Sequence, residues 1–210
     1  MSTAIRDAGF TLIELLRDSL VAVPTTAERP LSSRDQIQLL SPRDVNNNAN
    51  IRLTLFLYSI APAVALRNDF EIPGSQAFNG ELSEPLDLYY LLTAFGASDP
   101  ADPSAAALEA QELLGFAMRV FFDNGILAGS TLQGNLPRNE ELRLTLQPMT
   151  VEDLTRIWSV FPESVLRASV SYVLTPIRLR SVRQQGGARV ISRQADVDQV
   201  VPIQEREEAA

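Results

Sequence analysis

The fold depends first on one apolar stretch, Pro85-Leu86-Asp87-Leu88-Tyr89-Tyr90-Leu91-Leu92-Thr93. We predict a strand over residues 86–92. A helix stays open as the alternative, because Leu, Asp and Ala favour helices as well as they favour strands. The breaker-rich residues 96–100 end the segment on either reading.

The strongest strand signal lies upstream of this stretch, over residues 51–60. Ile51, Leu53, Leu55 and Leu57 alternate there with Arg52, Thr54, Phe56 and Tyr58, which is the period of a strand. Its second half is apolar on both faces, so we expect that half to be central and covered on both sides. Further strands are expected over residues 36–40, 142–147 and 168–179. In the last of these, Pro176 indicates an edge or a bulge.

Three segments have helical periodicity. The first helix is expected over residues 3–22 with Thr3 as N-cap, and Arg6, Glu14, Arg17 and Asp18 can be solvated. Asp102-Pro103 starts a second helix that runs to Asp123, where Asn124-Gly125 stops it. Thr150 caps a third, short helix through Val160, in which Trp158 is expected to pack in the core. The expected apolar faces comprise Ile5, Ala8, Leu12, Leu15, Leu16 and Leu20 in the first helix, and Leu108, Leu114, Ala117, Met118, Phe121 and Phe122 in the second.

These elements predict an α/β (α+β) fold in which helices flank a mixed, mostly antiparallel sheet. Residues 23–35, 41–50 and 67–84 are expected to be loops. We expect one domain over residues 1–183 and an extended C-terminal tail over residues 184–210, where Gly186-Gly187 precedes no strong pattern.

The N-terminal octapeptide Gly9-Phe10-Thr11-Leu12-Ile13-Glu14-Leu15-Leu16 resembles the type IV prepilin signature. A pilin needs about 20 apolar residues after this glycine to cross a bilayer. Arg17 and Asp18 interrupt the apolar run, and Pro24 ends any helix soon afterwards. We therefore expect a soluble amphipathic helix and no direct insertion into a membrane, with a pilin-like or pseudopilin subunit kept as the alternative.

The composition limits the chemistry that the chain can perform. Its 210 residues include no Cys and no His, and all 18 basic residues are Arg. Catalytic Ser-His-Asp and Cys-His sites, the usual zinc sites and Schiff-base lysines are therefore excluded. The formal net charge of -8 opposes binding to nucleic acid. We expect no catalytic residues, no cofactor and no metal. An enzyme that uses carboxylates, Tyr or Arg is the remaining alternative.

One charged cluster stands out near the C-terminus. It contains five arginines with no acidic residue among them: Arg178, Arg180, Arg183, Arg189 and Arg193. Arg178 and Arg180 are expected to share one face of the last strand. Beyond residue 193 the sign changes to mostly acidic, and a basic edge next to an acidic tail suits pairing between copies in a ring. These arginines are the candidate partner-binding residues, and the alternative is a solvated edge protected by charge.

Five ordered segments resemble the N-terminal domain of the tail-terminator, or cap, proteins of phage-tail-like extracellular contractile injection systems. They are Leu53-Thr54-Leu55-Phe56-Leu57-Tyr58, the opening stretch from Pro85 to Thr93, Leu113-Leu114-Gly115-Phe116-Ala117-Met118-Arg119, Glu152-Asp153-Leu154-Thr155-Arg156-Ile157-Trp158 and Tyr172-Val173-Leu174-Thr175-Pro176-Ile177. The resemblance covers roughly residues 4–182.

The resemblance implies a structural subunit that caps the tube and sheath of such a particle. It implies a sixfold ring of identical copies, inner-tube and sheath subunits as partners, and no catalytic residue. It also implies assembly in the cytoplasm and incorporation into a particle that is released or attached to a membrane.

Overall fold

The computed structural model describes residues 3–23, 30–45, 50–66, 83–96, 102–161 and 164–180, with the backbone alone for Ser83 and Arg180. The helices are α1 (Ala4–Ala22), α2 (Pro42–Val45), α3 (Pro103–Asp123) and α4 (Val151–Ser159). The strands are β1 (Ile37–Gln38), β2 (Leu53–Pro62), β3 (Ser83–Ala94), β4 (Ile126–Ala128), β5 (Glu141–Gln147) and β6 (Ser169–Arg180). Short 3-10 turns cover Arg34–Gln36, Val64–Leu66 and Gly129–Thr131.

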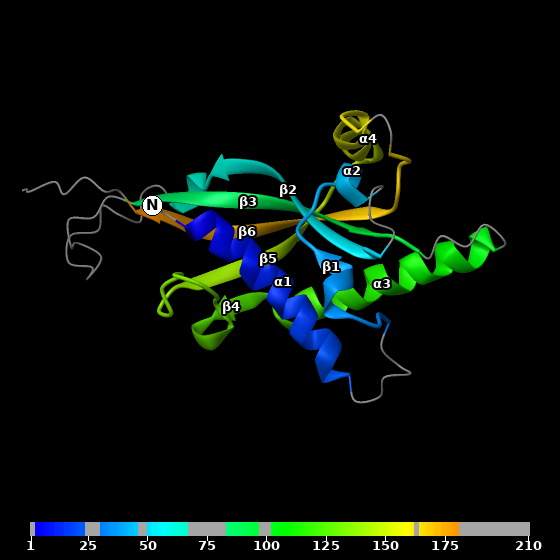
Figure 1. Ribbon diagram of the computed structural model, residues 1–210. Helices are drawn as coiled ribbons and strands as arrows, with labels where there is room; N and C mark the ends of the chain where they lie inside the picture. The colour runs from blue at the N-terminus through cyan, green and yellow to red at the C-terminus, as the bar shows by residue number, and fades with distance from the viewer. Residues whose placement is uncertain are drawn as a thin grey trace, which may run out of the picture.

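The six strands form one twisted sheet in the order β1-β2-β3-β6-β5-β4 (Figure 1). β1 pairs with β2 in parallel, and the other four pairings are antiparallel. The predicted class, a mixed and mostly antiparallel sheet flanked by helices, is confirmed. The predicted tail over residues 184–210 lies outside the described residues.

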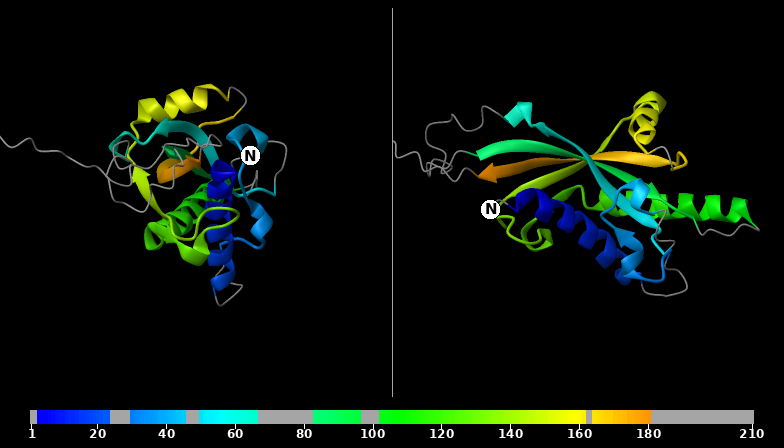
Figure 2. Two further views of the ribbon diagram at one scale, coloured as in Figure 1. Left: turned by 90° about the vertical axis from the view of Figure 1, so that its left-hand side faces the viewer. Right: turned by 45° about the horizontal axis from the view of Figure 1, so that its top comes forward.

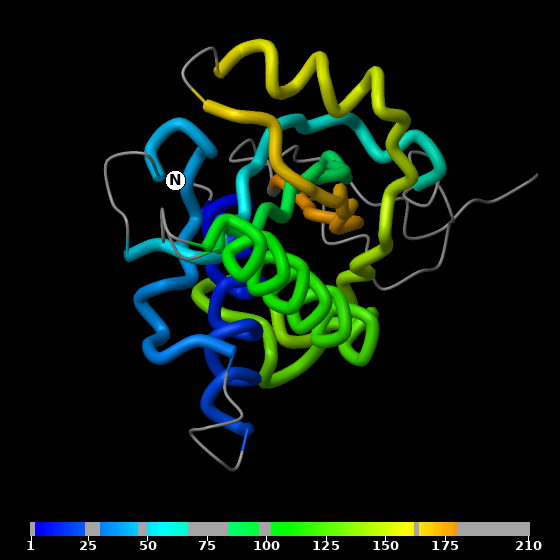
Figure 3. The backbone as a smooth tube through the Cα atoms, turned by 90° about the vertical axis from the view of Figure 1, so that its right-hand side faces the viewer, coloured from blue at the N-terminus to red at the C-terminus, as the bar shows by residue number. Residues whose placement is uncertain are grey.

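The two faces of the sheet are covered unequally. The long helices α1 and α3 lie on one face, which we call the core face, and α4 lies on the opposite, outer face (Figures 2 and 3). α1 contacts β1, β6 and α3, while α3 also contacts β3. The main hydrophobic core therefore lies between the sheet and the two long helices.

The stretch that opened the sequence analysis is a central strand, β3, so the strand prediction is confirmed and the helical alternative is wrong. Leu86, Leu88, Tyr90 and Leu92 belong to the core beneath α1 and α3. Leu91 is equally buried, but its side chain lies on the outer face because neighbouring side chains in a strand alternate. An apolar run on both faces marks a strand that is covered on both sides.

In β2 the covered half is the opposite of the predicted one. Leu53, Thr54 and Leu55 are buried, whereas Ser59, Ile60 and Pro62 are exposed. The reason is topological, because β1 pairs only with the first two residues of β2. The predicted strand over residues 36–40 is likewise reduced to Ile37–Gln38.

The second long helix has the predicted ends and only part of the predicted buried face. Asp102 accepts a hydrogen bond from the backbone N–H of Ala105, and Asn124 caps the C-terminus. The buried residues are Leu113, Phe116, Ala117, Val120 and Phe121. Leu108 and Phe122, which were expected on the apolar face, are exposed, so the orientation of α3 was predicted only in part.

Two short elements were not predicted. α2 lies in the segment expected to be a loop, and β4 follows the stop of α3 directly. Both are too short for a hydrophobic period to reveal them, since a period needs a window of many residues.

Pro176 sits at a bulge in β6, where the register with β3 shifts opposite Leu86 and Leu88. β6 is an internal strand, because β3 and β5 flank it. Its pairing with β5 nevertheless stops at Thr175. Among the described residues, the part from Pro176 onward therefore pairs with β3 alone, which is how an internal strand accommodates a residue without an N–H.

Candidate interaction surfaces

The structure describes only part of the predicted arginine cluster. Arg178 is half-buried and lies opposite Pro85 of β3, and the backbone of Arg180 lies opposite Ser83. The two residues lie at the last part of β6, where β5 no longer pairs with it. Arg183, Arg189 and Arg193 lie outside the described residues. The cluster as a whole stays a prediction, and its expected place on an edge strand is corrected to the end of an internal strand.

The prepilin-like octapeptide is built into the fold of the domain. Gly9 is buried in α1, and a Cβ at this position would lie 3.3 Å from the Leu39 side chain and 3.4 Å from the Tyr90 hydroxyl. The glycine therefore allows a close approach of α1 to the sheet. Within the described ranges, no helix combines the length and the apolarity needed to cross a membrane.

Glu14 of the same octapeptide is part of an ion-pair network and not a solvated charge. Its carboxylate accepts from Arg17 at 2.8 Å and from Arg34 at 2.6 Å, and Arg34 also pairs with Asp18. Arg17 donates in addition to the carbonyl of Ile37 in β1. The network ties α1 to the first edge of the sheet, so the expectation that Glu14 and Arg17 are simply solvated is wrong.

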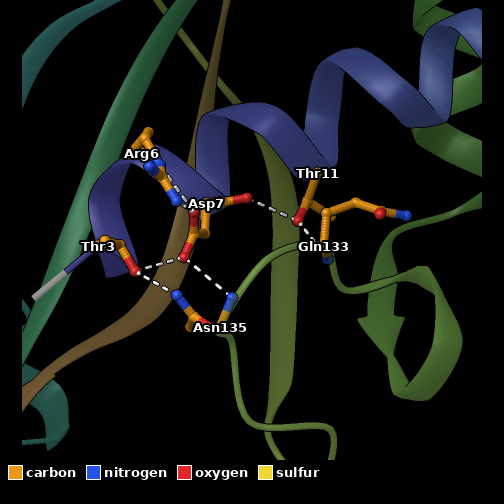
Figure 4. Close-up of polar contacts among 6 residues, drawn as sticks. All are labelled: Thr3, Arg6, Asp7, Thr11, Gln133 and Asn135. Carbon is orange, nitrogen blue, oxygen red and sulfur yellow. Dashed lines mark hydrogen bonds and ion pairs between the residues drawn. The ribbon is translucent and has the colours of Figure 1, made fainter.

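The most buried charge described in the structure is Asp7 of α1, whose residue is only 1% exposed (Figure 4). One carboxylate oxygen accepts from the Thr3 hydroxyl at 2.6 Å and from the backbone N–H of Asn135 at 3.0 Å. The other oxygen accepts two hydrogen bonds from the Arg6 guanidinium, at 2.8 and 2.9 Å. A buried carboxylate is stable only when it is paired and hydrogen-bonded in this way.

The same site holds the loop that precedes β5. The Thr11 hydroxyl accepts from the backbone N–H of Gln133 at 3.0 Å and donates to the carbonyl of Asp7 at 2.8 Å (Figure 4). Gly134 has φ +67°, and a Cβ there would lie 2.4 Å from the Asp7 carboxyl carbon. The loop therefore lies so close to α1 that a Cβ at residue 134 would clash with Asp7. We call Asp7, Thr11 and the segment 133–135 the loop anchor.

Two opposing effects set the pKa of Asp7. Burial raises it most strongly, but the hydrogen bonds from Thr3, Asn135 and Arg6 together lower the pKa below its ordinary value. The carboxylate is thus charged at neutral pH and serves as a structural acceptor. Its geometry gives it no acid-base role, because its oxygens point at donors of the protein itself.

The loop anchor was missed by reasoning from the sequence alone. A signal was present, since Thr3, Asp7 and Thr11 recur every four residues and so line one side of a helix. Its partner was not visible, because Asn135 lies 128 residues away along the chain.

On the outer face, α4 covers one end of the sheet. Trp158 is buried as predicted, and its ring meets Phe161, which in turn meets Phe56 of β2 edge-on. Beyond α4 the face carries half-exposed side chains: Tyr58 packs near Tyr89 and bonds to Ser171. Asp87 accepts from the Thr175 hydroxyl at 2.5 Å. This part of the face is a mixed polar and aromatic surface.

Neither face gathers the ligands of a metal ion. The described part of the chain contains no group of three or more acidic side chains placed to hold one. Some exposed ionic side chains are instead paired with one another, as Glu152 is with Arg156 and Glu141 with Arg143.

A protein of known structure has a similar fold. The chain is similar to the sheath/tube terminator of PVC, an extracellular contractile injection system, in its extended state, with 17% identity and a TM-score of 0.58 over 97% of this chain and 66% of that one. It is also similar to the tube-terminating cap of the anti-feeding prophage, with 18% identity and a TM-score of 0.47 over 84% of this chain and 61% of that one. The chain thus spans just under two thirds of the first of these proteins. No curated protein matches this chain.

The family comparison is the more specific finding. The family described as the Pvc16 N-terminal domain matches residues 9–193, which include α1 from Gly9 onward, all six strands and the segments whose resemblance to tail terminators was noted from the sequence. The chain belongs to the Pvc16 N-terminal domain family.

Proposed function

We propose that this chain is a structural subunit that caps the inner tube and sheath of a contractile injection system. The observation that carries the proposal is the family match over residues 9–193. The shared fold with a sheath/tube terminator supports it. In this role the chain binds other proteins and carries out no catalysis.

The proposed assembly is a homohexameric ring seated on the last layer of the tube. A closed ring needs two different complementary surfaces on each subunit. The described domain has free sheet edges at both ends and a partly open outer face. The predicted arginine cluster from Arg178 to Arg193, followed by the acidic tail, remains part of this proposal as a candidate contact between copies or with the sheath.

The proposed site of assembly is the cytoplasm, before the finished particle is released or attached to a membrane. The net charge of -8 supports partners other than nucleic acid. The alternative pilin-like role has no support in the family match, and Gly9 is buried against Leu39 and Tyr90.

The proposal is tested by mixing the purified chain with tube and sheath subunits of the same particle and imaging the products by electron microscopy. We expect rings at one end of each tube and tubes of limited length. Omission of the chain should give open tube ends. A chain that stays monomeric and never associates with a tube end would contradict the proposal.

A further inference from the structure

The middle of α3 contains a glycine that the described fold does not require. Gly115 is exposed and helical. Among the described residues, no atom outside the backbone of the surrounding helix lies within 4 Å of the position that a Cβ would occupy. Glycine in the middle of a helix is less favourable than alanine, because it loses more conformational entropy on folding. A glycine at an open position of this kind suits the close approach of a second backbone.

Two exposed apolar side chains lie at equal distances on either side of Gly115. Leu108 is 64% exposed and Phe122 is 85% exposed. Each is separated from the glycine by two turns of helix, which advance about 10.5 Å and return to almost the same side. The three residues therefore form one line along α3, on the side opposite to Ala117 and Val120, which are buried.

The same side of the helix carries one acidic and one basic residue close to the glycine. Glu112 lies about one turn before Gly115 and Arg119 about one turn after it, on the same flank. Both residues are exposed, and neither forms an ion pair with another described residue. We call Leu108, Glu112, Gly115, Arg119 and Phe122 the α3 stripe.

The N-terminal half of α3 leaves the stripe open to a partner. It contains no buried residue before Leu113 and extends beyond the end of the sheet (Figures 1 and 2). An ion pair between Glu109 and Arg52 and the close approach of Ala106 to Gly96 hold this half on one side. The opposite side, which carries the stripe, faces solvent.

The α3 stripe is complementary to a second copy of itself. When two identical helices cross antiparallel at Gly115, residues at equal distances on opposite sides of the glycine meet across a two-fold axis. Leu108 of each copy then meets Phe122 of the other. Glu112 of each copy likewise meets Arg119 of the other, so the charges attract at both ends of the contact. A parallel arrangement would instead bring like charges together.

Asp123 lies at the margin of this contact. It is exposed and lies about 80° around the helix from Gly115. In the antiparallel arrangement it comes beside Ala105 and Leu108 of the other copy, which are uncharged. Ala105 is also in the first turn of that helix, where the helix dipole favours a negative charge. The aspartate therefore adds no contact between like charges.

We propose that α3 is a dimerisation helix, in which the α3 stripes of two copies pack antiparallel with Gly115 at the crossing point. A two-fold contact closes with two copies, so it differs from the contacts of the proposed ring and does not rest on them. It is a property of the free chain without tube or sheath. Because a contact along one helix is small, we expect a Kd on the order of micromolar.

Charge reversal tests the antiparallel pairing. Glu112→Arg and Arg119→Glu each place like charges against one another at both ends of the contact. Each variant alone should therefore associate at least about tenfold more weakly than wild type. An equimolar mixture of the two should form heterodimers with about wild-type affinity, because both ion pairs are then restored with reversed or retained signs. Sedimentation up to about 100 µM protein, roughly a hundredfold above the expected Kd, measures this.

The matched control is Glu152→Arg on α4. Glu152 is exposed and pairs with Arg156 within its own helix. Reversal of its charge changes the net charge of the chain as much as Glu112→Arg does, but it lies outside the α3 stripe. The control should therefore dimerise like wild type, and its loss of dimers would mean that net charge and not the stripe governs association.

Substitution of Gly115 tests the close approach of the two helices. Gly115→Leu places a large side chain at the crossing point and should abolish the dimer. In the dilute monomer the same variant should unfold at an equal or higher temperature, because the new side chain meets open space and leucine is the better helix former. Circular dichroism during heating separates this effect from misfolding. Unchanged dimers in Gly115→Leu would overturn the inference.

The remaining outcomes separate this inference from the proposed function. A wild-type chain that stays monomeric at about 100 µM would overturn the inference, whereas the capping role has its own test with tube and sheath subunits. A mixture of the two charge variants that fails to associate would overturn the antiparallel pairing. If wild type is monomeric and Gly115→Leu loses binding to tubes, the stripe contacts the tube subunit and not a second copy.

Discussion

Asp7 on the core side of the sheet and Asp153 on the outer side accept nearly the same hydrogen bonds. Each takes one from a Thr hydroxyl, at 2.6 Å from Thr3 and 2.7 Å from Thr150, and one from a backbone N–H. Each also has an arginine nearby. The two carboxylates differ in burial and in the sequence separation of the groups that they join.

Asp153 joins neighbours in a capping box, because Thr150 and Asp153 satisfy each other's backbone N–H groups at the start of α4. The hydrogen bond from the Thr150 side chain is the main reason that the pKa of this exposed carboxyl is lowered. Asp7 instead joins α1 to a loop 128 residues away and does so in the interior. The same kind of hydrogen bonds thus stabilises the start of α4 at Asp153 and the packing of two distant segments at Asp7.

The largest effect is expected from Gly134→Ala. The new Cβ would displace the Asp7 carboxylate, and the residue has φ +67°. We expect a loss of about 3 kcal/mol in the free energy of unfolding, of which about 1–2 kcal/mol comes from the left-handed backbone. Chemical denaturation measures it.

Gly129→Ala is the matched control, since that residue has φ +61° and nothing lies within 4 Å of an added Cβ. It should lose only the backbone contribution, about 1–2 kcal/mol. Equal losses in the two variants would show that the carboxylate moves aside freely and that the loop anchor is not rigid.

A smaller effect is expected from Asp7→Asn, which keeps the shape but turns one acceptor into a donor facing other donors. We expect a loss of about 2 kcal/mol at pH 7. Asp18→Asn, an exposed change on the same helix, should lose no more than about 0.5 kcal/mol.

The loss of unfolding free energy in Asp7→Asn is expected to depend on pH. Because the folded-state pKa of Asp7 is lowered, its stabilisation is complete above the ordinary value of about 3.9 and disappears as the pH falls through the folded-state pKa. The difference in unfolding free energy between wild type and Asp7→Asn should therefore shrink below about pH 3.9. A difference that is constant down to pH 2 would contradict a charged role for Asp7.

The smallest effect is expected on the outer side, from Thr150→Ala. Loss of the N-cap should destabilise α4 by about 1 kcal/mol. Hydrogen exchange should show faster exchange of the α4 amides and unchanged exchange in α1, because the hydrogen bonds of the capping box join Thr150 and Asp153 to each other. Spread of the effect into α1 would mean that the two sides of the sheet are coupled.

Local features of the fold were predictable because neighbouring residues carry them. The caps at Asp102 and Thr150 and the stop at Asn124 all depend on contacts within a few residues. The buried half of β2 was predicted wrongly and the buried face of α3 only in part, because both depend on which element lies next to them.

The candidate surfaces also include one feature that was evident from the sequence and one that was not. The arginines near the C-terminus were evident from the sequence, and only Arg178 is described with its side chain. The loop anchor was not evident. It combines residues such as Asp7 and Asn135 that meet only after the chain has folded.

The sequence by itself determined the class of fold, the ends of the long helices and the absence of His and Cys chemistry, whereas from Pro85 to Thr93 it favoured a strand and left a helix open. These follow from local propensity, period and composition. Only the tertiary structure decided strand order, and with it which half of β2 is free, where β4 ends the sheet and how Gly134 meets Asp7. The physical reason is that burial and strand pairing are properties of contacts between distant segments, which no local pattern specifies.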